Sequence, residues 1–146
     1  MKRTALFVLT LFAALSVFAK ERSYSIVSPS GKIETQVNVG SIVDYEIRYD
    51  GRTVLAPSAV SMTLSDGRVW GVDAKVAKVS RGSVDSMADS PLYRASKLRE
   101  RYNSLIVNFK GGWSLEFRVY DDAVAYRFAT ALDQPFRVGR EQVSYN

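Results

Sequence analysis

Apolar and polar residues alternate one by one along two neighbouring stretches in the first half of the chain. The first stretch covers residues 32–39 and the second covers residues 43–49. Alternation with a period of two predicts half-buried β-strands. Asp50-Gly51 follows directly and predicts a tight hairpin turn, because both central residues of that turn need positive φ. The chain then returns until Pro57, which is expected to end the third strand of a meander.

The pattern is weaker in the middle of the chain. Residues 60–64 alternate, residues 65–67 predict a turn, and a short return strand is expected at Val69 and Trp70. Residues 80–91 are rich in Ser, Gly, Asp and Pro and show little periodicity. We interpret them as a loop.

Residues 92–102 are the only helix candidate. The stretch is short, Pro91 precedes it, and it has no clear stop signal, so an irregular or extended segment is favoured. Its basic residues favour a solvated edge over a binding patch, because runs of charge are usually exposed.

The last third of the chain has the clearest alternation, with large aromatic residues on the apolar side. Residues 105–109, 113–119 and 124–128 alternate, and turns are expected at residues 110–112 and 121–122. About eight short strands with regularly spaced turns predict an all-β fold, an antiparallel β-sandwich. Residues 142–146 look like the opening of another strand, so either a domain ends on a strand here or the sandwich is incomplete.

The first 19 residues have the three parts of a secretory signal. Lys2 and Arg3 are followed by an uncharged, mostly apolar run that ends at Phe18 and Ala19. The run is shorter than the roughly 20 apolar residues that a membrane-spanning helix needs. We therefore predict a signal peptide over residues 1–19 with cleavage after Ala19, and one exported domain over residues 20–146.

Composition narrows the possible chemistry. Loss of residues 1–19 removes two of the 20 basic residues and leaves 18 against 15 acidic residues, a net charge of +3. This mild, scattered charge argues against nucleic acid as a partner, and no membrane contact is expected after cleavage. The absence of Cys and His excludes disulfides, Ser-His-Asp and Cys-His nucleophile systems, and imidazole-ligated zinc.

The acidic residues offer no strong catalytic or metal site. Asp121 and Asp122 are adjacent and would point to opposite faces of a strand, so turn chemistry explains them better than paired acid–base catalysis. Asp85 and Asp89 lie in the expected loop, but their spacing lacks the pattern of a dedicated calcium site. We assign no catalytic residue and no metal ligand from the sequence.

The two tryptophans are the candidates for sugar stacking. Trp113 lies on the apolar side of its strand and is expected in the core. Trp70 flanks a turn and is the better candidate for carbohydrate binding, although buried aromatic residues are commoner than exposed platforms.

Four blocks of the sequence carry a family resemblance: Ser28-Pro29-Ser30-Gly31-Lys32-Ile33, residues 45–58, Tyr102-Asn103-Ser104-Leu105 and residues 115–128. In this order they resemble the N-terminal domain of glycoside hydrolase family 97, a family of exo-acting α-glucosidases and α-galactosidases found mostly in Bacteroidetes-type bacteria. Two departures occur, Ala123 in place of a usual glycine and Ser104 in place of a usual glutamate.

The resemblance implies a β-supersandwich related to the galactose-mutarotase-like fold, followed in the parent protein by a catalytic TIM barrel and a C-terminal β domain. It also implies Ca²⁺ in the parent enzyme, and it puts the catalytic carboxylates and the calcium-binding glutamate beyond this chain. The expected role is a non-catalytic scaffold for the barrel and its oligosaccharide site, in the periplasm of a Gram-negative, Bacteroidetes-like bacterium. The alternative is a stand-alone carbohydrate-binding or structural surface module.

Overall fold

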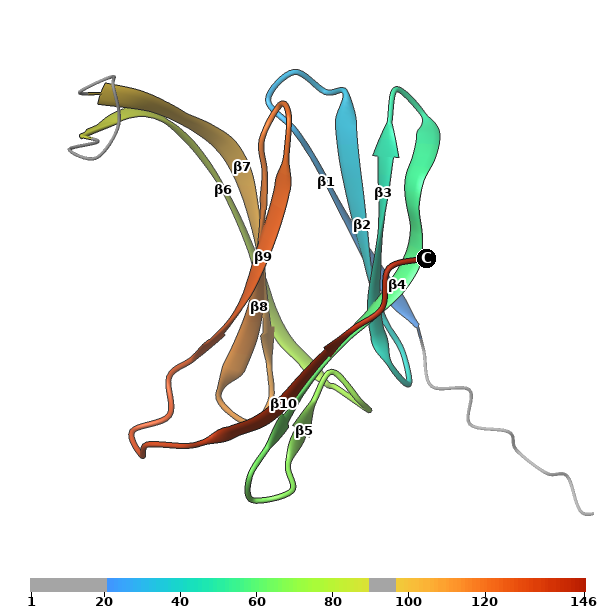
Figure 1. Ribbon diagram of the computed structural model, residues 1–146, viewed down its shortest axis with the longest axis vertical. Helices are drawn as coiled ribbons and strands as arrows, with labels where there is room; N and C mark the ends of the chain where they lie inside the picture. Colours follow the sequence, from blue (N-terminus) through green and yellow to red (C-terminus); the bar gives the residue numbers. More distant parts are fainter. Residues whose placement is uncertain (1–20, 90–96) are drawn as a thin grey trace, which may run out of the picture.

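Two antiparallel sheets face each other in the computed structural model, which describes residues 21–89 and 97–146 (Figure 1). The expected signal peptide and part of the 92–102 segment lie outside the described residues. The described residues form ten strands: β1 (Arg22–Val27), β2 (Ile33–Val39), β3 (Val43–Tyr49), β4 (Arg52–Leu64), β5 (Val69–Trp70), β6 (Val76–Asp89), β7 (Lys97–Phe109), β8 (Trp113–Val119), β9 (Val124–Thr130) and β10 (Val138–Val143). The all-β antiparallel sandwich expected from the sequence is confirmed.

The first sheet contains the meander that the alternation predicted. Its order is β1-β2-β3-β4-β10, and the short strand β5 also pairs with β4. Asp50 and Gly51 connect β3 to β4 with φ angles of 46° and 76°, as the tight turn requires. β1 was not expected from the pattern, and it pairs with β2 along its whole length.

Pro57 does not end its strand, so that prediction was wrong. β4 runs on for 13 residues, from Arg52 to Leu64. The pairing of β4 with β3 is irregular here, because Leu55 and Ser58 have partners in β3 while the two residues between them do not. A bulge leaves proline out of the hydrogen-bonded ladder, so the missing N–H costs no ladder hydrogen bond.

The second sheet has the order β6-β7-β8-β9. The loop expected over residues 80–91 is wrong for its described part, because β6 reaches Asp89 and pairs with β7 from Val76 to Asp89. Residues 97–102 are extended, as expected, and form the first half of β7. β6 pairs only with β7 in the described sheet, so a strand of small polar residues can form there without burying its side chains.

The hydrophobic core lies between the two sheets. β8 presents Trp113, Leu115, Phe117 and Val119 to it, as the alternation predicted. Each large side chain buried in this way contributes about 1.5–3 kcal/mol to stability. The other buried apolar residues of this core are Ile26, Ile33, Val37, Val39, Val43, Tyr45, Val60, Leu64, Trp70, Leu105, Val107 and Phe109.

Within residues 21–89 and 97–146, no helix is long and apolar enough to cross a membrane.

Candidate functional site

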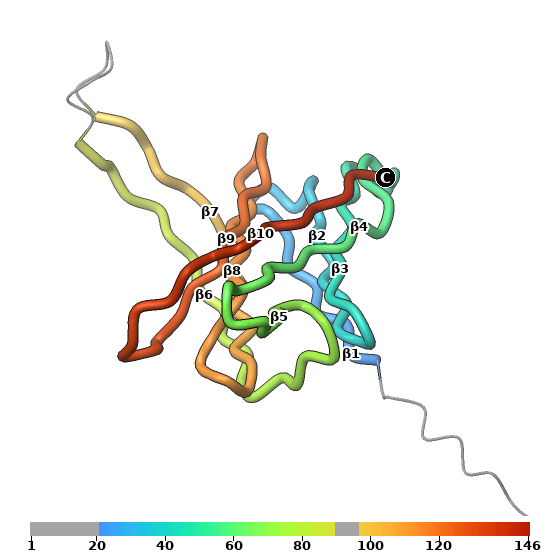
Figure 2. Tube along the Cα trace, turned by 60° about the horizontal axis from the view of Figure 1, so that its bottom comes forward, coloured from blue at the N-terminus to red at the C-terminus, as the bar shows by residue number. Residues whose placement is uncertain are grey.

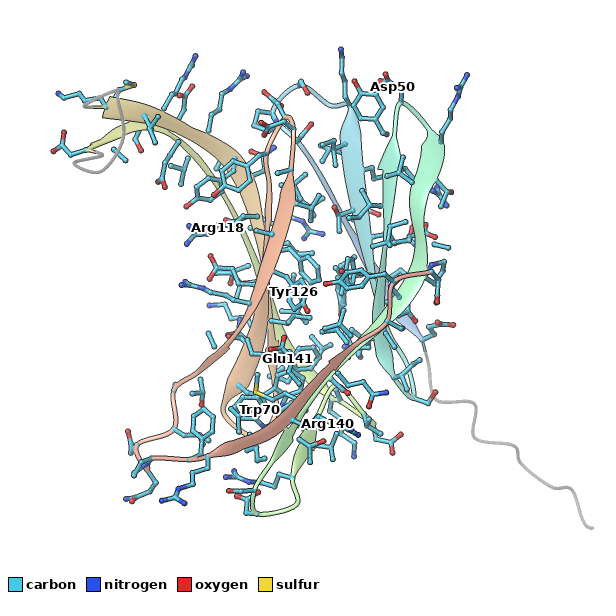
Figure 3. The ribbon with its side chains drawn as sticks, viewed as in Figure 1. Asp50, Trp70, Arg118, Tyr126, Arg140 and Glu141 are labelled. Carbon is cyan, nitrogen blue, oxygen red and sulfur yellow. The ribbon has the colours of Figure 1, made fainter. Side chains whose placement is uncertain are left out.

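Trp70 is a core residue and not an exposed sugar platform. Its residue surface is 4% exposed, and its ring stacks on Trp113 with centroids 5.5 Å apart and an interplanar angle of 6°. Phe136 packs against it at 5.4 Å. A sugar needs a free ring face for stacking, so this burial contradicts the prediction of carbohydrate binding at Trp70 (Figure 3). Trp113 is in the core, as expected.

Asp121 joins two sequence blocks that lie far apart in the chain. It sits with Asp122 in the turn between β8 and β9, which confirms turn chemistry for this pair. Its Oδ1 accepts a hydrogen bond of 2.7 Å from the backbone N–H of Ser30, in the β1–β2 connection. Its Oδ2 lies 3.4 Å from Nη1 of Arg101 in β7. The turn therefore ties the two sheets together at one end of the sandwich.

The hydrogen bonds from Ser30 and the charge of Arg101 hold the pKa of Asp121 below its ordinary value. Ionised Asp121 therefore stabilises the fold above the ordinary aspartate pKa, and this contribution is lost as the pH falls through the lowered folded pKa. We expect Asp121→Ala to lower the urea midpoint of unfolding at about pH 7, and the gap to the wild type to narrow by about pH 3.

The matched control for this prediction is Asp122→Ala, which changes the exposed neighbour in the same turn. It should leave the urea midpoint nearly unchanged at both pH values. Equal effects of the two substitutions at neutral pH would mean that the contact between Asp121 and Ser30 contributes nothing specific.

Asp85 and Asp89 do not form a metal site. Asp85 accepts two hydrogen bonds from Arg99, from Nε at 2.8 Å and from Nη2 at 2.7 Å. Arg99 and Arg101 hold the pKa of Asp85 below its ordinary value, mainly through these hydrogen bonds. In the described part of the chain, no three acidic side chains gather as metal ligands would. These residues therefore do not fit a calcium ion.

A charged cluster covers the outer face of the second sheet. Glu116 in β8 accepts hydrogen bonds from Nε of Arg118 at 2.9 Å and from Nε of Arg127 at 2.7 Å. Arg118 also lies over the ring of Tyr102, 4.8 Å from its centroid. Burial raises the pKa of Glu116, but the two guanidinium partners outweigh it and hold the pKa below its ordinary value. Glu116 is therefore an ionised structural partner and not a proton donor at neutral pH.

The sequence prediction did not identify this cluster as a unit. Only 8% of Glu116 is exposed, because the side chains of Arg118 and Arg127 hold its carboxylate. Glu116 lies directly opposite Arg127 across the β8–β9 pair. Opposite charges at paired positions are the signal that could have revealed the contact, once the register of the two strands is known.

Two side chains of the second sheet reach the edge strand β1 at one side of the sandwich. Nδ2 of Asn103 donates a 2.8 Å hydrogen bond to the backbone carbonyl of Val27, and Nη2 of Arg81 lies 3.4 Å from the carbonyl of Ser25. These contacts occupy backbone acceptors on an edge strand. An edge protected in this way is a poor site for adding another strand.

The opposite side, between β9 and β10, is lined by aromatic residues. Tyr126 in β9 packs on Tyr45 in β3 with centroids 5.6 Å apart, and its hydroxyl lies 3.4 Å from Oε1 of Glu141 in β10 (Figure 3). Burial, followed by the charge of Glu141, raises the pKa of Tyr126. Phe128 and Phe136 are only partly buried here. Tyr126, Phe128 and Phe136 therefore form the partly buried edge of the core on this side.

Comparison with known proteins decides the family. The family model described as Glycosyl-hydrolase 97 N-terminal matches residues 26–146. The chain belongs to this family. A retaining alpha-galactosidase from Bacteroides thetaiotaomicron is 43% identical to this family 97 domain over 145 residues, which are 99% of this chain and 22% of that protein. The chain thus spans about a fifth of the relative that it matches.

Solved structures show the same fold. A family 97 enzyme from Pseudoalteromonas sp. strain K8 in complex with acarbose superposes with a TM-score of 0.71 and 22% identity, over 82% of this chain and 20% of that chain. A beta-arabinopyranosidase superposes with a TM-score of 0.74 and 23% identity, over 84% of this chain and 21% of that chain. In each relative the family 97 domain is a small part of a longer polypeptide. Other domains of the same parent polypeptide are therefore the partners that the comparisons support for this domain.

Proposed function

We propose that this chain is the leading, non-catalytic part of a glycoside hydrolase that acts on α-galactosides. The observation that carries the proposal is the 43% identity to a retaining alpha-galactosidase over nearly the whole chain. α-Glucosides are the second substrate class, because the family resemblance covers both. The matched region is about a fifth of that relative, so the catalytic groups of the parent belong to its remaining part.

The domain's role in this proposal is to support the catalytic barrel and one wall of its sugar site. The partly buried aromatic side between β9 and β10 is the surface that we propose to contact the rest of the parent. Tyr126, Phe128 and Phe136 supply apolar area there, and Glu141 supplies a carboxylate next to the Tyr126 hydroxyl. A C-terminal β domain in the parent is a further part of the proposal.

We also propose that the parent enzyme binds Ca²⁺ and that it is exported. Ca²⁺ would act in the parent as a Lewis acid or electrostatic partner at the sugar site. Its ligands are proposed to come from parts of the parent outside this chain, because the described carboxylates do not fit the ion. Residues 1–19 are proposed to direct the parent to the periplasm, since they combine a basic start with a short apolar run.

The substrate assignment is tested with the full-length parent protein in calcium-containing buffer. We expect it to hydrolyse nitrophenyl α-galactoside with a kcat/KM well above that for nitrophenyl α-glucoside, because a site built to hydrogen-bond one sugar hydroxyl rejects an epimer that misplaces it. The 146-residue chain, assayed at the same concentration, should show no turnover. A parent that prefers the glucoside contradicts the substrate, and turnover by the short chain contradicts the non-catalytic role.

A further inference from the structure

The second sheet carries a ribbon of two strands that leaves the body of the sandwich (Figures 1 and 2). β8 pairs with β7 from Asn103 onward, opposite Val119. Beyond that point β6 and β7 continue as six paired positions, from Val84 opposite Tyr102 to Asp89 opposite Lys97. We call residues 84–89 and 97–102 the ribbon arm. No third strand pairs with the ribbon arm in the part of the chain that the structure describes.

The ribbon arm exposes apolar side chains on both of its faces. Met87 is 59% exposed and Leu98 is 43% exposed. Met87 lies opposite Arg99 and Leu98 lies opposite Ala88, so the two exposed residues point to opposite faces because neighbouring side chains alternate. Two-stranded ribbons are marginal in water without a further packing surface. The exposed apolar positions therefore indicate that the arm packs against something else.

The ribbon arm carries three acidic and three basic residues, so its charges balance. Arg99 makes two hydrogen bonds to Asp85, and Arg101 lies between Asp85 and Asp121. The ion pair between Arg101 and Asp121 also fixes the base of the arm to the turn after β8. These charges select no strongly acidic or basic partner. A partner that binds the exposed apolar side chains would therefore offer an apolar pocket or strip on each side of the arm.

We propose that the ribbon arm docks against the remainder of its own parent polypeptide, which receives Met87 and Leu98 in apolar contacts. This inference rests on the proposed function, because it needs the longer parent. About four-fifths of the matched alpha-galactosidase lies outside the region shared with this chain. Covalent linkage gives such a partner a millimolar-scale effective concentration, far above that of a second copy in a dilute solution.

The test uses the full-length parent with the photoreactive amino acid benzoylphenylalanine in place of Leu98. After irradiation we expect a crosslink within one molecule, from position 98 to a peptide beyond residue 146. The matched control carries the same photoreactive residue in place of Val69 in β5, which is 41% exposed, close to the 43% of Leu98. It should crosslink to that downstream region much less than the Leu98 variant.

Three results overturn the inference: a covalent dimer through position 98, crosslinks confined to residues 1–146, or equal downstream crosslinking from positions 69 and 98. Both replaced side chains are exposed, so folding of the parent should be retained. The galactoside assay on the unmodified parent is read separately. An inactive parent with the expected crosslink refutes the activity alone, and an active parent without the crosslink refutes the arm contact alone.

Discussion

Trp70→Ala is expected to lower the free energy of unfolding of the domain by about 3–5 kcal/mol, because it leaves a large cavity in the core. Trp70 packs against Trp113, Phe128 and Phe136, which belong to β8, β9 and the connection to β10. Their rings cannot all move inward to fill the space. Urea unfolding of the purified chain, followed by circular dichroism, measures the loss.

Trp70→Phe is the matched control, because it keeps an aromatic ring in the cavity and should cost clearly less than the alanine change. Val54→Ala controls for truncation of an exposed side chain and should be nearly neutral. An unchanged urea midpoint for Trp70→Ala would contradict the assignment of Trp70 to the core. It would favour the prediction from the sequence that Trp70 is an exposed residue for sugar stacking. Stability therefore separates the two interpretations without any sugar.

The second large effect is expected at Gly71, which directly follows β5. Its φ is 97°, and an added Cβ would lie 2.4 Å from the carbonyl oxygen of Val60 and 3.0 Å from Cα of Ser61. Its own carbonyl accepts a 2.7 Å hydrogen bond from the N–H of Val43, so the backbone cannot move freely. We expect Gly71→Ala to cost about 1–2 kcal/mol in backbone strain and a further 1–3 kcal/mol or so in overpacking.

Gly67→Ala is the control for Gly71→Ala. Gly67 has a φ of 88°, but an added Cβ there meets no atom within 4 Å. Its substitution tests the backbone strain alone, and urea unfolding should show about half the loss or less. Equal losses in the free energy of unfolding at the two positions would contradict the overpacking. They would show that the backbone near Val60 makes room for the added Cβ at position 71 without a further loss of stability.

The alternating segments were predictable because strand geometry is local. β8 is the clearest case, since neighbouring side chains point to opposite faces and one face of the strand carries Trp113, Leu115, Phe117 and Val119. The Asp50-Gly51 turn was predictable for the same reason, because the φ angles it needs depend on those two residues alone.

β6 was not predictable from its own residues. Its segment contains serine, glycine and aspartate, which alone favour turns. It is a strand because β7 offers a continuous row of backbone partners along its whole length. Pro57 shows the same limit, since the bulge that accommodates it depends on how β3 and β4 meet.

The candidate site residues divide in the same way. The sequence correctly put Asp121 and Asp122 in a turn, but it could not show that Asp121 binds the N–H of Ser30, which is 91 residues away. It also left Trp70 beside a turn with no sign of what covers its ring. Trp113 and Phe136 cover it only after the two sheets have packed together.

The sequence by itself determined the fold class, the better alternating strands, the four predicted turns and the family. Those features depend on neighbouring residues along the chain, or on blocks of sequence that persist in order. The tertiary structure decided which side chains are covered, which segment becomes the edge strand β6, and which carboxylates are paired. These outcomes depend on contacts between residues far apart in the chain, and their register is set when the two sheets close around a common core.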